Sequence, residues 1–568
     1  MKRKMICTLL AALMILQLAG CGSPGSNSET SSSPAAGTDS SAAVAESSTA
    51  DPMGKYETPI TIHFARQVDD TIEANVLANY PDQTIEDNFW LKTYEDELGI
   101  KVVYDWIVKG GDEYKQKLNV TLASNEIPDM MSVEATPLMQ LVEADMIQDM
   151  SSVYEKYASP LSKALMNQDG DAPFIAARKD GKLFGLPNTG GSIDSVDLMW
   201  LRTDWLEKLK LKAPTTMDEV LTMIDAFTNA DFDGNNKKDA VGMVIAGTDL
   251  WGGYAGLKGF FNAYGAYPQN WVEKDGKLVY GSIQPENKEA LIALNSMFTK
   301  GYLDKEFGVK DGGKAGESAG SGLAGFSFGQ QWNSLWPLQS CKDNFPDSQW
   351  SSFPIPSATG NAAKAQISLG TTSWMVVNKN FDKPEALVKM MNLFMEKCWG
   401  ETGDNGKYYA PPEAEGVWKL SPVSPSPPNK NLDAYLEIEE ARQKKDASDL
   451  KGEALSIQSK LDSFYSGSKE GFALWGWERI YGPDPSSYSA IDKYVKENRT
   501  IMDQFVGAPT ATMTEKMSTL KKMQDEVFTK IILGESSIDE FDKFVDDFMK
   551  LGGQQITTEV NEWYESSK

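Results

Sequence analysis

The order of strand-like and helix-like segments near the start of the folded region constrains the fold most. Short runs of β-branched and aromatic residues alternate with helix-length segments that have one apolar face. Strand-forming, helix-forming and strand-forming segments in this order favour an α/β lobe with a mostly parallel sheet. The predicted strands are Ile60–Phe64, Ile100–Val108 and Met130–Val133, and the predicted helices are 86–98, 113–123 and 136–143.

The length of the chain indicates more than one lobe. A chain of 568 residues exceeds what a single hydrophobic core usually supports. Further helices are expected from a capping-box pattern at Thr216 and Glu219, and from apolar periodicity later in the chain. These helices are predicted up to Asn229 and over 284–300, 513–533 and 537–551, the last one stopping at Gly552–Gly553.

The first residues have the features of an export signal. Three basic residues precede the apolar run Met5–Ala19, and the small pair Ala19–Gly20 stands directly before Cys21. This order resembles the lipobox of bacterial lipoproteins, which implies cleavage after residue 20 and lipidation of Cys21. The alternative is a plain N-terminal membrane anchor. Residues 21–56 are rich in Ser and Ala and are predicted to form a flexible tether, because they contain few large apolar residues to bury.

Charge and rare residues exclude several classes of function. A formal net charge of −26 argues against binding to nucleic acid or anionic lipid, and it disfavours strongly anionic ligands. The single histidine, His63, rules out a His-rich zinc site and is best read as a strand residue. In an exported protein Cys341 and Cys398 could form a disulfide, but two buried thiols are equally compatible with the sequence.

Several segments together resemble extracellular solute-binding protein family 1, the LipO-like substrate-binding lipoproteins of ABC transporters. They occur in the family's order along nearly the whole mature chain, although Asn125 and Glu126 replace the usual Gly-Asp before Pro-Asp. The segments are Lys117–Asp129, Gly181–Pro187, Leu201–Leu209, Asp231–Asp239, Lys288–Leu291, Gly301–Phe307 and Thr558–Tyr564.

The resemblance implies a two-lobed periplasmic-binding-protein-like fold of type II, α/β in class, with a hinge between the lobes. It places lobe 1 at 57–190 plus about 366–420, and lobe 2 at 191–365 plus about 421–568. It also implies a monomer on the extracellular face of the cytoplasmic membrane, held there only by its lipid anchor. The expected partner is the transmembrane part of an ABC permease, to which the ligand is delivered.

Aromatic side chains in glycine-rich surroundings are the candidate ligand platforms. Sugar rings have apolar C–H faces that stack on flat aromatic rings, while carboxylates and amides bind their hydroxyls. Any one of these aromatics could equally be a core residue, as Trp205 is expected to be. The candidates are Trp106, Trp251, Tyr254, Tyr264, Trp271, Trp332, Trp374, Trp475 and Trp477, with Arg66, Asn125, Glu126 and Glu478 as polar partners.

Acidic and amide residues alternate around Gly234 in a pattern suited to a hard cation. Calcium takes six or more oxygen ligands in flexible geometry. The spacing resembles the EF-hand type calcium loop of alginate-oligosaccharide-binding relatives, which implies a structural Ca²⁺, although Ala240 stands where the family often has Glu. The alternative is an Asx/Gly turn without metal. The implied ligands are Asp231, Asp233, Asn235, Asp239 and the backbone carbonyl of Lys237.

The resulting hypothesis is a binding protein without catalytic activity that captures an oligosaccharide. The same scaffold could instead bind a peptide, an amino-acid derivative or a polyol. A more remote alternative is a glycoside hydrolase, which needs two carboxylates across a cleft. Because the chain has 81 acidic residues, some pair would satisfy that spacing by chance, so their abundance does not discriminate.

Overall fold

The structure is a computed structural model, and it describes residues 51–411 and 416–567. The predicted signal peptide 1–20, Cys21 and residues 21–50 of the predicted tether lie outside the described residues. Residues 51–56, also assigned to the tether, contact the folded body: Asn392 Nδ2 donates to the carbonyl of Pro52 at 2.8 Å, and the backbone N–H of Tyr56 donates to Leu98 at 2.9 Å. Among the described residues, no helix is long and apolar enough to cross a membrane.

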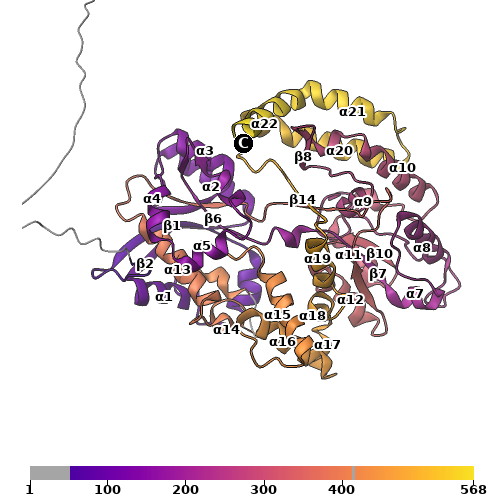
Figure 1. Ribbon diagram of the computed structural model, residues 1–568, viewed down its shortest axis with the longest axis horizontal. Helices are drawn as coiled ribbons and strands as arrows, with labels where there is room; N and C mark the ends of the chain where they lie inside the picture. The colour runs from indigo at the N-terminus through magenta and orange to yellow at the C-terminus, as the bar shows by residue number, and fades with distance from the viewer. Residues whose placement is uncertain (1–50, 412–415, 568) are drawn as a thin grey trace, which may run out of the picture. The chain divides into compact units, whose positions relative to one another are not determined.

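A five-stranded sheet organises the first lobe (Figure 1). Its strand order is β2-β1-β3-β13-β6, with β1 (Ile60–Val68) parallel to both β2 (Ile100–Lys109) and β3 (Met130–Val133). The two remaining strands come from later in the chain, and β13 (Trp374–Val377) runs antiparallel to both β3 and β6 (Leu186–Pro187). The predicted strand and helix order is confirmed, with β3 at the predicted bounds.

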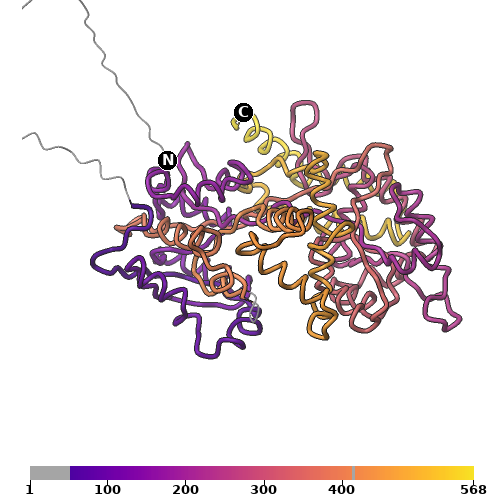
Figure 2. Tube along the Cα trace, turned by 60° about the horizontal axis from the view of Figure 1, so that its bottom comes forward, coloured from indigo at the N-terminus to yellow at the C-terminus, as the bar shows by residue number. Residues whose placement is uncertain are grey.

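The helices of this lobe follow from local sequence. Helix α1 (Phe89–Leu98) begins because Asn88 accepts a hydrogen bond from the N–H of Leu91 at 3.1 Å, and it ends at Gly99, whose φ of 68° favours glycine. Helix α2 (Gly111–Ser124) contacts β1 and β2, and helix α3 (Ala135–Glu143) contacts β13. Helix α13 (Glu385–Trp399) contacts α1. Figure 2 shows indigo and orange segments side by side, in keeping with the contact between α1 and α13.

A second core forms around a three-stranded antiparallel sheet, β10 (Phe326–Gly329), β7 (Leu198–Arg202) and β11 (Trp350–Phe353). All five residues of β7 are buried. Helix α8 (Met217–Asn229) has the predicted capping box between Thr216 and Glu219. Trp205 in α7 (Thr203–Leu209) is 1% exposed, which confirms its prediction as a core residue.

The predicted stop at Gly552–Gly553 is confirmed. The helical backbone breaks at Gly552, within the turn Met549–Gly553 that stands between α21 (Glu540–Phe548) and α22 (Gln554–Ser566). Gly552 absorbs the kink with a φ of 147°, a backbone conformation that residues with a Cβ rarely adopt. The chain resumes a helix because Ile556 and Val560 are fully buried in the second core.

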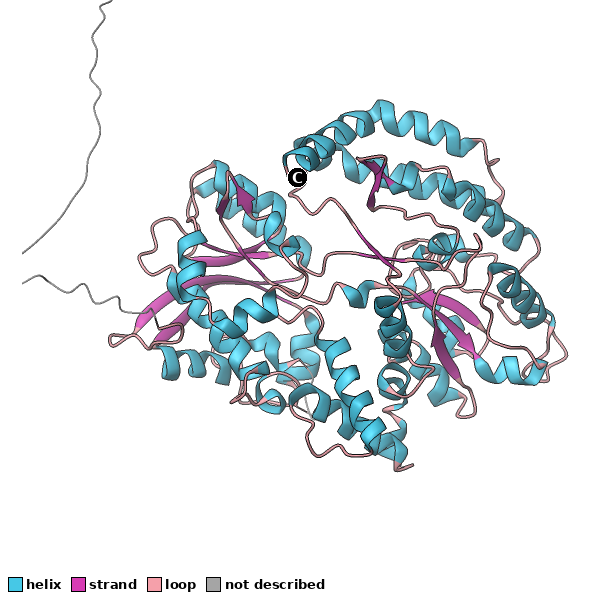
Figure 3. Cartoon of the chain, in the orientation of Figure 1, coloured by secondary structure: helices cyan, strands magenta, loops and turns pink. Residues whose placement is uncertain are grey.

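Most of the remaining chain is helical (Figure 3). Two helices are packed against each other in lobe 2, α10 (Glu286–Thr299) and α20 (Ala511–Leu533). The other elements are α4 (Ser151–Tyr157), α5 (Pro160–Met166), α6 (Ala172–Ile175), β4 (Arg178–Lys179), β5 (Lys182–Leu183), α9 (Lys258–Ala263), β8 (Trp271–Lys274), β9 (Lys277–Tyr280), α11 (Gly312–Gly320), α12 (Leu338–Asn344), β12 (Ala365–Ile367), α14 (Asn405–Tyr408), α15 (Lys430–Lys444), α16 (Gly452–Tyr465), α17 (Lys469–Phe472), α18 (Trp475–Tyr481), α19 (Ser487–Lys496) and β14 (Thr500–Met502).

Buried apolar residues form two large clusters. The first gathers residues from 62–186 and 374–423, and the second gathers residues from 193–367 and 432–560. The lobe boundaries at about 190, 366 and 420 stay a prediction. Cys341 and Cys398 are both buried and free, and Cys398 belongs to the first cluster while Cys341 lies in a smaller third one. Burial raises the pKa of the Cys398 thiol well above its usual value.

Three segments, 187–197, 366–373 and 421–431, lead from one cluster to the other, and they contact one another directly. The N–H of Ser426 donates to the carbonyl of Thr189 at 2.9 Å, and the N–H of Gly370 donates to Ser192 Oγ at 2.7 Å. Gly190 and Gly370 face each other so closely that a Cβ on Gly370 would lie 2.3 Å from the carbonyl oxygen of Gly190. We call these segments the three crossing segments.

Candidate functional site

A cavity of about 880 Å³ lies at the carboxyl ends of β1 and β3. β1 and β3 are neighbours in the sheet, and the chain leaves β1 toward β2 on one side but leaves β3 toward β6 on the other side. Open α/β sheets bind ligands at such a point, because the diverging connections leave a crevice there. The cavity is lined by Arg66–Asp69 and Ser132–Glu134, by the crossing segments near Asn188, Ser373 and Ser421, and by Thr514 near the start of α20.

Uncharged polar side chains from β3 and from the residues directly after β6 and before β13 meet in this cavity. Asn188 Nδ2 donates to Ser132 Oγ at 3.2 Å and to Ser373 Oγ at 3.1 Å. The backbone N–H of Asn188 donates to the carbonyl of Ser373 at 3.0 Å, which fixes the position of the amide side chain. The remaining side-chain atom, Asn188 Oδ1, is buried and has no hydrogen-bond partner. The amide of Asn188 therefore links β3 to the residues next to β13 and β6 at the edge of the cavity.

Charged side chains around the cavity are already engaged with protein groups. Lys419 Nζ lies 2.9 Å from Asp69 Oδ2, and Lys115 Nζ lies 3.2 Å from Glu134 Oε1. Burial raises the pKa of Asp69, but hydrogen bonds from Thr71 and Lys419 outweigh it, so the pKa falls below its usual value.

Arg66, a predicted ligand residue, lines the cavity but is held by residues 419–420, directly before the third crossing segment. Its guanidinium donates to the carbonyl of Leu420 at 3.0 Å, to the carbonyl of Lys419, and to the Tyr104 hydroxyl at 2.9 Å. It therefore fastens residues 419–420 to strand β1.

Two aromatic residues that were not predicted, Tyr114 and Trp418, line the cavity. The Tyr114 hydroxyl donates to the carbonyl of Ser132, and burial raises its pKa above the usual value. The predicted Trp106 packs behind it, with the two ring centroids 5.4 Å apart. Tyr114 comes three residues after Gly110–Gly111 and Trp418 two residues after Gly416, so the neighbouring glycines that guided the prediction could have identified both.

The other predicted residues of lobe 1 lie away from the cavity lining. Asn125 is the C-cap of α2 with a φ of 56°, and both Asn125 and Glu126 are exposed. Trp374 is 3% exposed, and its indole N–H donates to the carbonyl of Pro173 at 2.7 Å.

Several predicted aromatics of lobe 2 are buried. Tyr254, Trp271 and Trp475 are each no more than 3% exposed. Tyr264 stacks on Phe260, and Trp251 donates its indole N–H to Asp525 Oδ1 at 2.7 Å. Trp251 is only partly buried, but it packs against the second core.

The predicted pair Trp477 and Glu478 lies on α18. Trp477 is partly buried, with Lys460 Nζ 3.4 Å from its ring centroid. Glu478 is 3% exposed; it accepts a hydrogen bond from Arg479 Nε at 2.5 Å and another from the Tyr465 hydroxyl at 3.3 Å. Neither residue lines the cavity described above.

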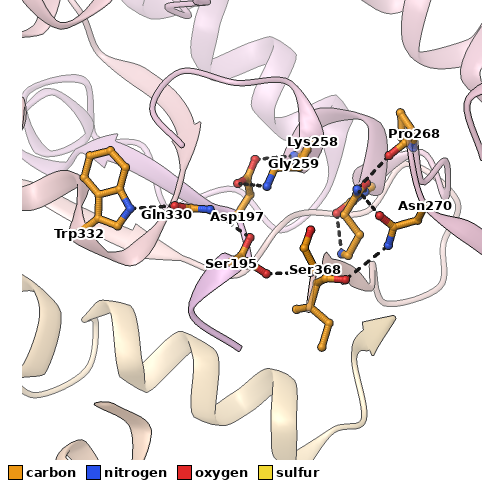
Figure 4. Close-up of polar contacts among 12 residues, drawn as sticks. Ser195, Asp197, Lys258, Gly259, Pro268, Asn270, Gln330, Trp332 and Ser368 are labelled. Atoms are coloured by element: carbon orange, nitrogen blue, oxygen red, sulfur yellow. Dashed lines mark hydrogen bonds and ion pairs between the residues drawn. The ribbon is translucent and has the colours of Figure 1, made fainter. Parts of the chain in front are cut away.

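Trp332 is fixed by a chain of polar contacts that reaches the crossing segments (Figure 4). Its indole N–H donates to Gln330 Oε1 at 2.8 Å, and Gln330 Nε2 donates to the carbonyl of Ser195 at 3.5 Å. Ser195 Oγ accepts the N–H of Ser368 at 2.9 Å, which ties the first two crossing segments together. Trp336 stacks on Trp332 with ring centroids 6.4 Å apart and is 44% exposed.

The Asp-rich loop closes around an amide group. Asn235 Nδ2 donates to Asp233 Oδ2 at 2.8 Å and to Asp239 Oδ2 at 2.9 Å, while Lys237 N–H donates to Asn235 Oδ1. Backbone N–H groups of Asn236 and Gly234 bond Asp231 and lower its pKa. Within the described part of the chain, no group of three or more His, Cys, Asp or Glu side chains could hold a metal ion.

One segment has the letters of a hydrolase motif but not its structure. Residues Gly316–Gly320 read Gly-x-Ser-x-Gly, which in hydrolases places the serine on a sharp turn between a strand and a helix. Here Ser318 lies inside α11, and its carbonyl accepts the N–H groups of Leu323 and Ala324. The single histidine, His63, lies on β1, and its Nδ1 is 2.6 Å from Asp105 Oδ1 on β2.

Comparisons with known proteins agree with this geometry. Residues 90–395 match the family described as bacterial extracellular solute-binding protein. The chain is 23% identical to the polygalacturonan/rhamnogalacturonan-binding protein YtcQ of Bacillus subtilis over 490 residues, 84% of this chain and 88% of YtcQ. It is also 23% identical to lipoprotein LipO of the same organism over 516 residues, 88% of this chain and 93% of LipO.

A solved structure shows the same fold. It is that of the Streptococcus pneumoniae ABC-transporter substrate-binding protein FusA, as an EF-hand mutant in complex with fructo-nystose. It matches with a TM-score of 0.57 and 17% identity, over 89% of this chain and 99% of FusA. The chain therefore belongs to the bacterial extracellular solute-binding protein family, and it has the two-lobed α/β fold of the substrate-binding proteins of ABC transporters.

Proposed function

We propose that this protein captures an oligosaccharide between its two lobes and delivers it, chemically unaltered, to the transmembrane subunits of an ABC permease. The observation that carries the proposal is the cavity at the carboxyl ends of β1 and β3. Its lining combines hydroxyl and amide side chains with the rings of Tyr114 and Trp418. Sugars need this combination, because their hydroxyls form hydrogen bonds and their C–H faces stack on aromatic rings. The names of YtcQ and FusA support the same class of ligand.

Capture would use the hinge formed by the three crossing segments. Thr514 brings the start of α20, a helix of the second core, to the cavity in the first lobe. A ligand that bonds both sides stabilises the closed arrangement by its differential affinity for it. On the second lobe, the stacked pair Trp332 and Trp336 would offer a ring face. Release would need no chemistry, only opening of the hinge.

Location and anchoring complete the proposal. The match to an extracellular family and to lipoprotein LipO supports cleavage before Cys21 and lipidation of that cysteine. The protein would then act as a monomer on the extracellular face of the cytoplasmic membrane, tethered only by its lipid. Radiolabelled fatty acid that enters the wild type but not a Cys21→Ala variant would support the anchor, and equal labelling would contradict it.

We also propose that the Asp-rich loop binds a structural Ca²⁺. The side chains of this loop offer oxygen atoms, which are the ligands that calcium prefers. Carboxylate oxygens of Asp233 and Asp239 both accept hydrogen bonds from Asn235 Nδ2, and a cation could take the place of this amide group. The proposal is tested by thermal unfolding of Asp233→Ala. In calcium, the melting temperature of the variant should be lower than that of the wild type. In EDTA, the two proteins should melt at the same temperature. A melting temperature lowered equally in calcium and in EDTA would identify a turn without metal.

A ligand panel tests the main proposal. The mature chain, residues 21–568 with Cys21→Ala to prevent lipidation, is titrated with oligosaccharides, peptides, amino-acid derivatives and polyols. We expect the melting temperature to rise with oligosaccharides only, and small-angle scattering to show a smaller radius of gyration with the same ligand. A rise with peptides or polyols alone would assign the other ligand class. Shortened sugar products in the incubation would instead indicate a glycoside hydrolase.

A further inference from the structure

We infer that Arg66 binds a carboxylate of the ligand, so that the preferred oligosaccharides contain uronic acids. This role rests on the proposed function and deepens it, because it names the chemical class of sugar that the cavity at the carboxyl ends of β1 and β3 takes. It runs against the expectation, drawn from the net charge of the whole chain, that anionic ligands are disfavoured.

The charged side chains that line the cavity leave one cation without an anion. They are Arg66, Lys115, Lys419, Asp69 and Glu134. Lys419 Nζ lies 2.9 Å from Asp69 Oδ2 and Lys115 Nζ lies 3.2 Å from Glu134 Oε1, so these four charges compensate one another. Every hydrogen-bond partner of Arg66 in the described part of the chain is neutral. Because the nearest charges dominate the potential inside a cleft, this site attracts an anion although the chain as a whole is acidic.

The guanidinium of Arg66 is held in place before a ligand arrives. Its Nη1 donates to the Tyr104 hydroxyl at 2.9 Å and to the carbonyl of Leu420 at 3.0 Å, and its Nη2 donates to the carbonyl of Lys419. Its Cζ lies 5.7 Å from the centroid of the Tyr104 ring. A side chain that is already fixed loses little conformational entropy when it binds a ligand.

One edge of this guanidinium keeps free donors. An arginine has five N–H donors, and in the described part of the chain the Nε–H of Arg66 bonds no protein group, while Nη2 has a second N–H. Nε and Nη2 form one edge of the planar fork, which can bind both oxygens of a carboxylate. Arg66 is only partly buried, and its Nε is not among the buried polar atoms that lack a partner. A ligand carboxylate can therefore reach this edge from the cavity that Arg66 lines.

A uronate uses this edge better than a neutral sugar does. A carboxylate accepts two hydrogen bonds from the fork and also compensates its charge, whereas a sugar hydroxyl does neither. Hydrogen bonds between charged groups are roughly twice as strong as those between neutral groups. The sugar ring of a uronate keeps its apolar C–H groups, so it can still stack on Tyr114 or Trp418, which line the same cavity.

The test is calorimetric titration of the mature chain and of its Arg66→Gln variant. The probes are oligomers of galacturonate, glucuronate and mannuronate, the methyl ester of each, and neutral fructo-oligosaccharides. Methyl esterification removes the charge of a uronide and keeps its ring and its linkage. The matched control is Arg178→Gln, because Arg178 is an exposed arginine on β4 of the same lobe and does not line the cavity. Melting curves verify that each variant folds.

We expect the wild type to bind one of the uronides at least about tenfold more tightly than the methyl ester of that uronide. Added salt should weaken binding of the uronide and leave binding of the ester unchanged, because only the uronide is charged. Arg66→Gln should lose about tenfold in affinity for the uronide and stay within about threefold of wild type for the ester. Arg178→Gln should bind both probes as the wild type does.

Three results would overturn the inference while the proposed function stands. If Arg66 only fastens residues 419–420, Arg66→Gln should lose affinity for the uronide and for the ester by the same factor. A wild type that binds no uronide more tightly than its ester, or that binds only fructo-oligosaccharides, would also overturn it. The last two results come from the wild type alone, so they decide the question even if Arg66→Gln does not fold. Absence of binding to every oligosaccharide would contradict the proposed function itself, and the inference with it.

Discussion

Replacing Asp503 by asparagine should make the protein more stable at neutral pH, by an amount that depends on pH. Asp503 follows β14 and is largely buried, and its Oδ1 accepts the N–H groups of Trp271 at 3.0 Å and Phe505 at 3.1 Å. Burial raises its pKa from 3.8 to about 6, and the two hydrogen bonds do not offset this effect. The asparagine side chain would keep both bonds through its own Oδ1 and would carry no charge.

The magnitude follows from linkage. Because the folded state holds the proton more tightly than the unfolded state, stability falls as pH rises from about 4 to about 6 and is constant above that. One pKa unit corresponds to about 1.4 kcal/mol, so the displacement from 3.8 to about 6 corresponds to at most about 3 kcal/mol. The variant should therefore gain up to about 3 kcal/mol over the wild type between about pH 3.5 and about pH 7.

The assay is urea unfolding followed by tryptophan fluorescence, for both proteins at several pH values. Only the difference between the two free energies of unfolding is used, so other titrating groups cancel. Asp546→Asn, an exposed change on α21, is the matched control and should give a difference near zero at every pH. A difference between wild type and Asp503→Asn that did not change with pH, or that shrank toward neutral pH, would refute the reasoning.

The remaining predictions concern the hinge, a buried ion pair and a helix cap. Gly370→Ala should lower the melting temperature, because its Cβ would lie 2.3 Å from the Gly190 carbonyl oxygen. Lys430→Met should cost about 3–5 kcal/mol in urea unfolding, since Glu453 Oε1, 2.9 Å from Lys430 Nζ, would stay buried without its cation. Thr216→Ala should cost about 1 kcal/mol in the same assay, because α8 loses its N-cap.

Each of these variants has a control. Gly312→Ala should melt like the wild type, because nothing lies within 4 Å of the added Cβ. Adding Glu453→Gln to Lys430→Met should recover part of the loss, since it removes the uncompensated charge. Thr216→Ser keeps the capping oxygen and should be close to neutral. A Gly370→Ala variant as stable as Gly312→Ala, or single and double Lys430 variants of equal stability, would contradict the packing described here.

Features that depend on neighbours in sequence could be predicted well. The capping box at Thr216 and Glu219 is formed by residues three apart, and strand β3 is a short apolar run with clear ends. The helix stop at Gly552–Gly553 is likewise a local signal, and the backbone breaks there. The new helix that follows it, α22, could not be predicted in this way, because it depends on the tertiary burial of Ile556.

The site could be predicted only in part, because strand pairing assembles it. Ser132, Asn188 and Ser373 lie far apart in sequence, and they meet only because β3, β13 and β6 are neighbours in the sheet. No local pattern marks such residues. Glycine-rich surroundings indicated Trp475 as a ligand platform. The neighbouring Gly476 has a packing role instead, because a Cβ at this position would lie 2.8 Å from the carbonyl oxygen of Ser334. The tryptophan itself is core.

Native mass spectrometry of the mature chain, incubated with mixed oligosaccharides and peptides, tests the central claim most directly. The mass of the complex reports both whether a ligand binds and whether it has been cut. The account predicts one added mass that equals an intact oligosaccharide. A protein that carries no added mass, a peptide, or only fragments of the sugars supplied would contradict it.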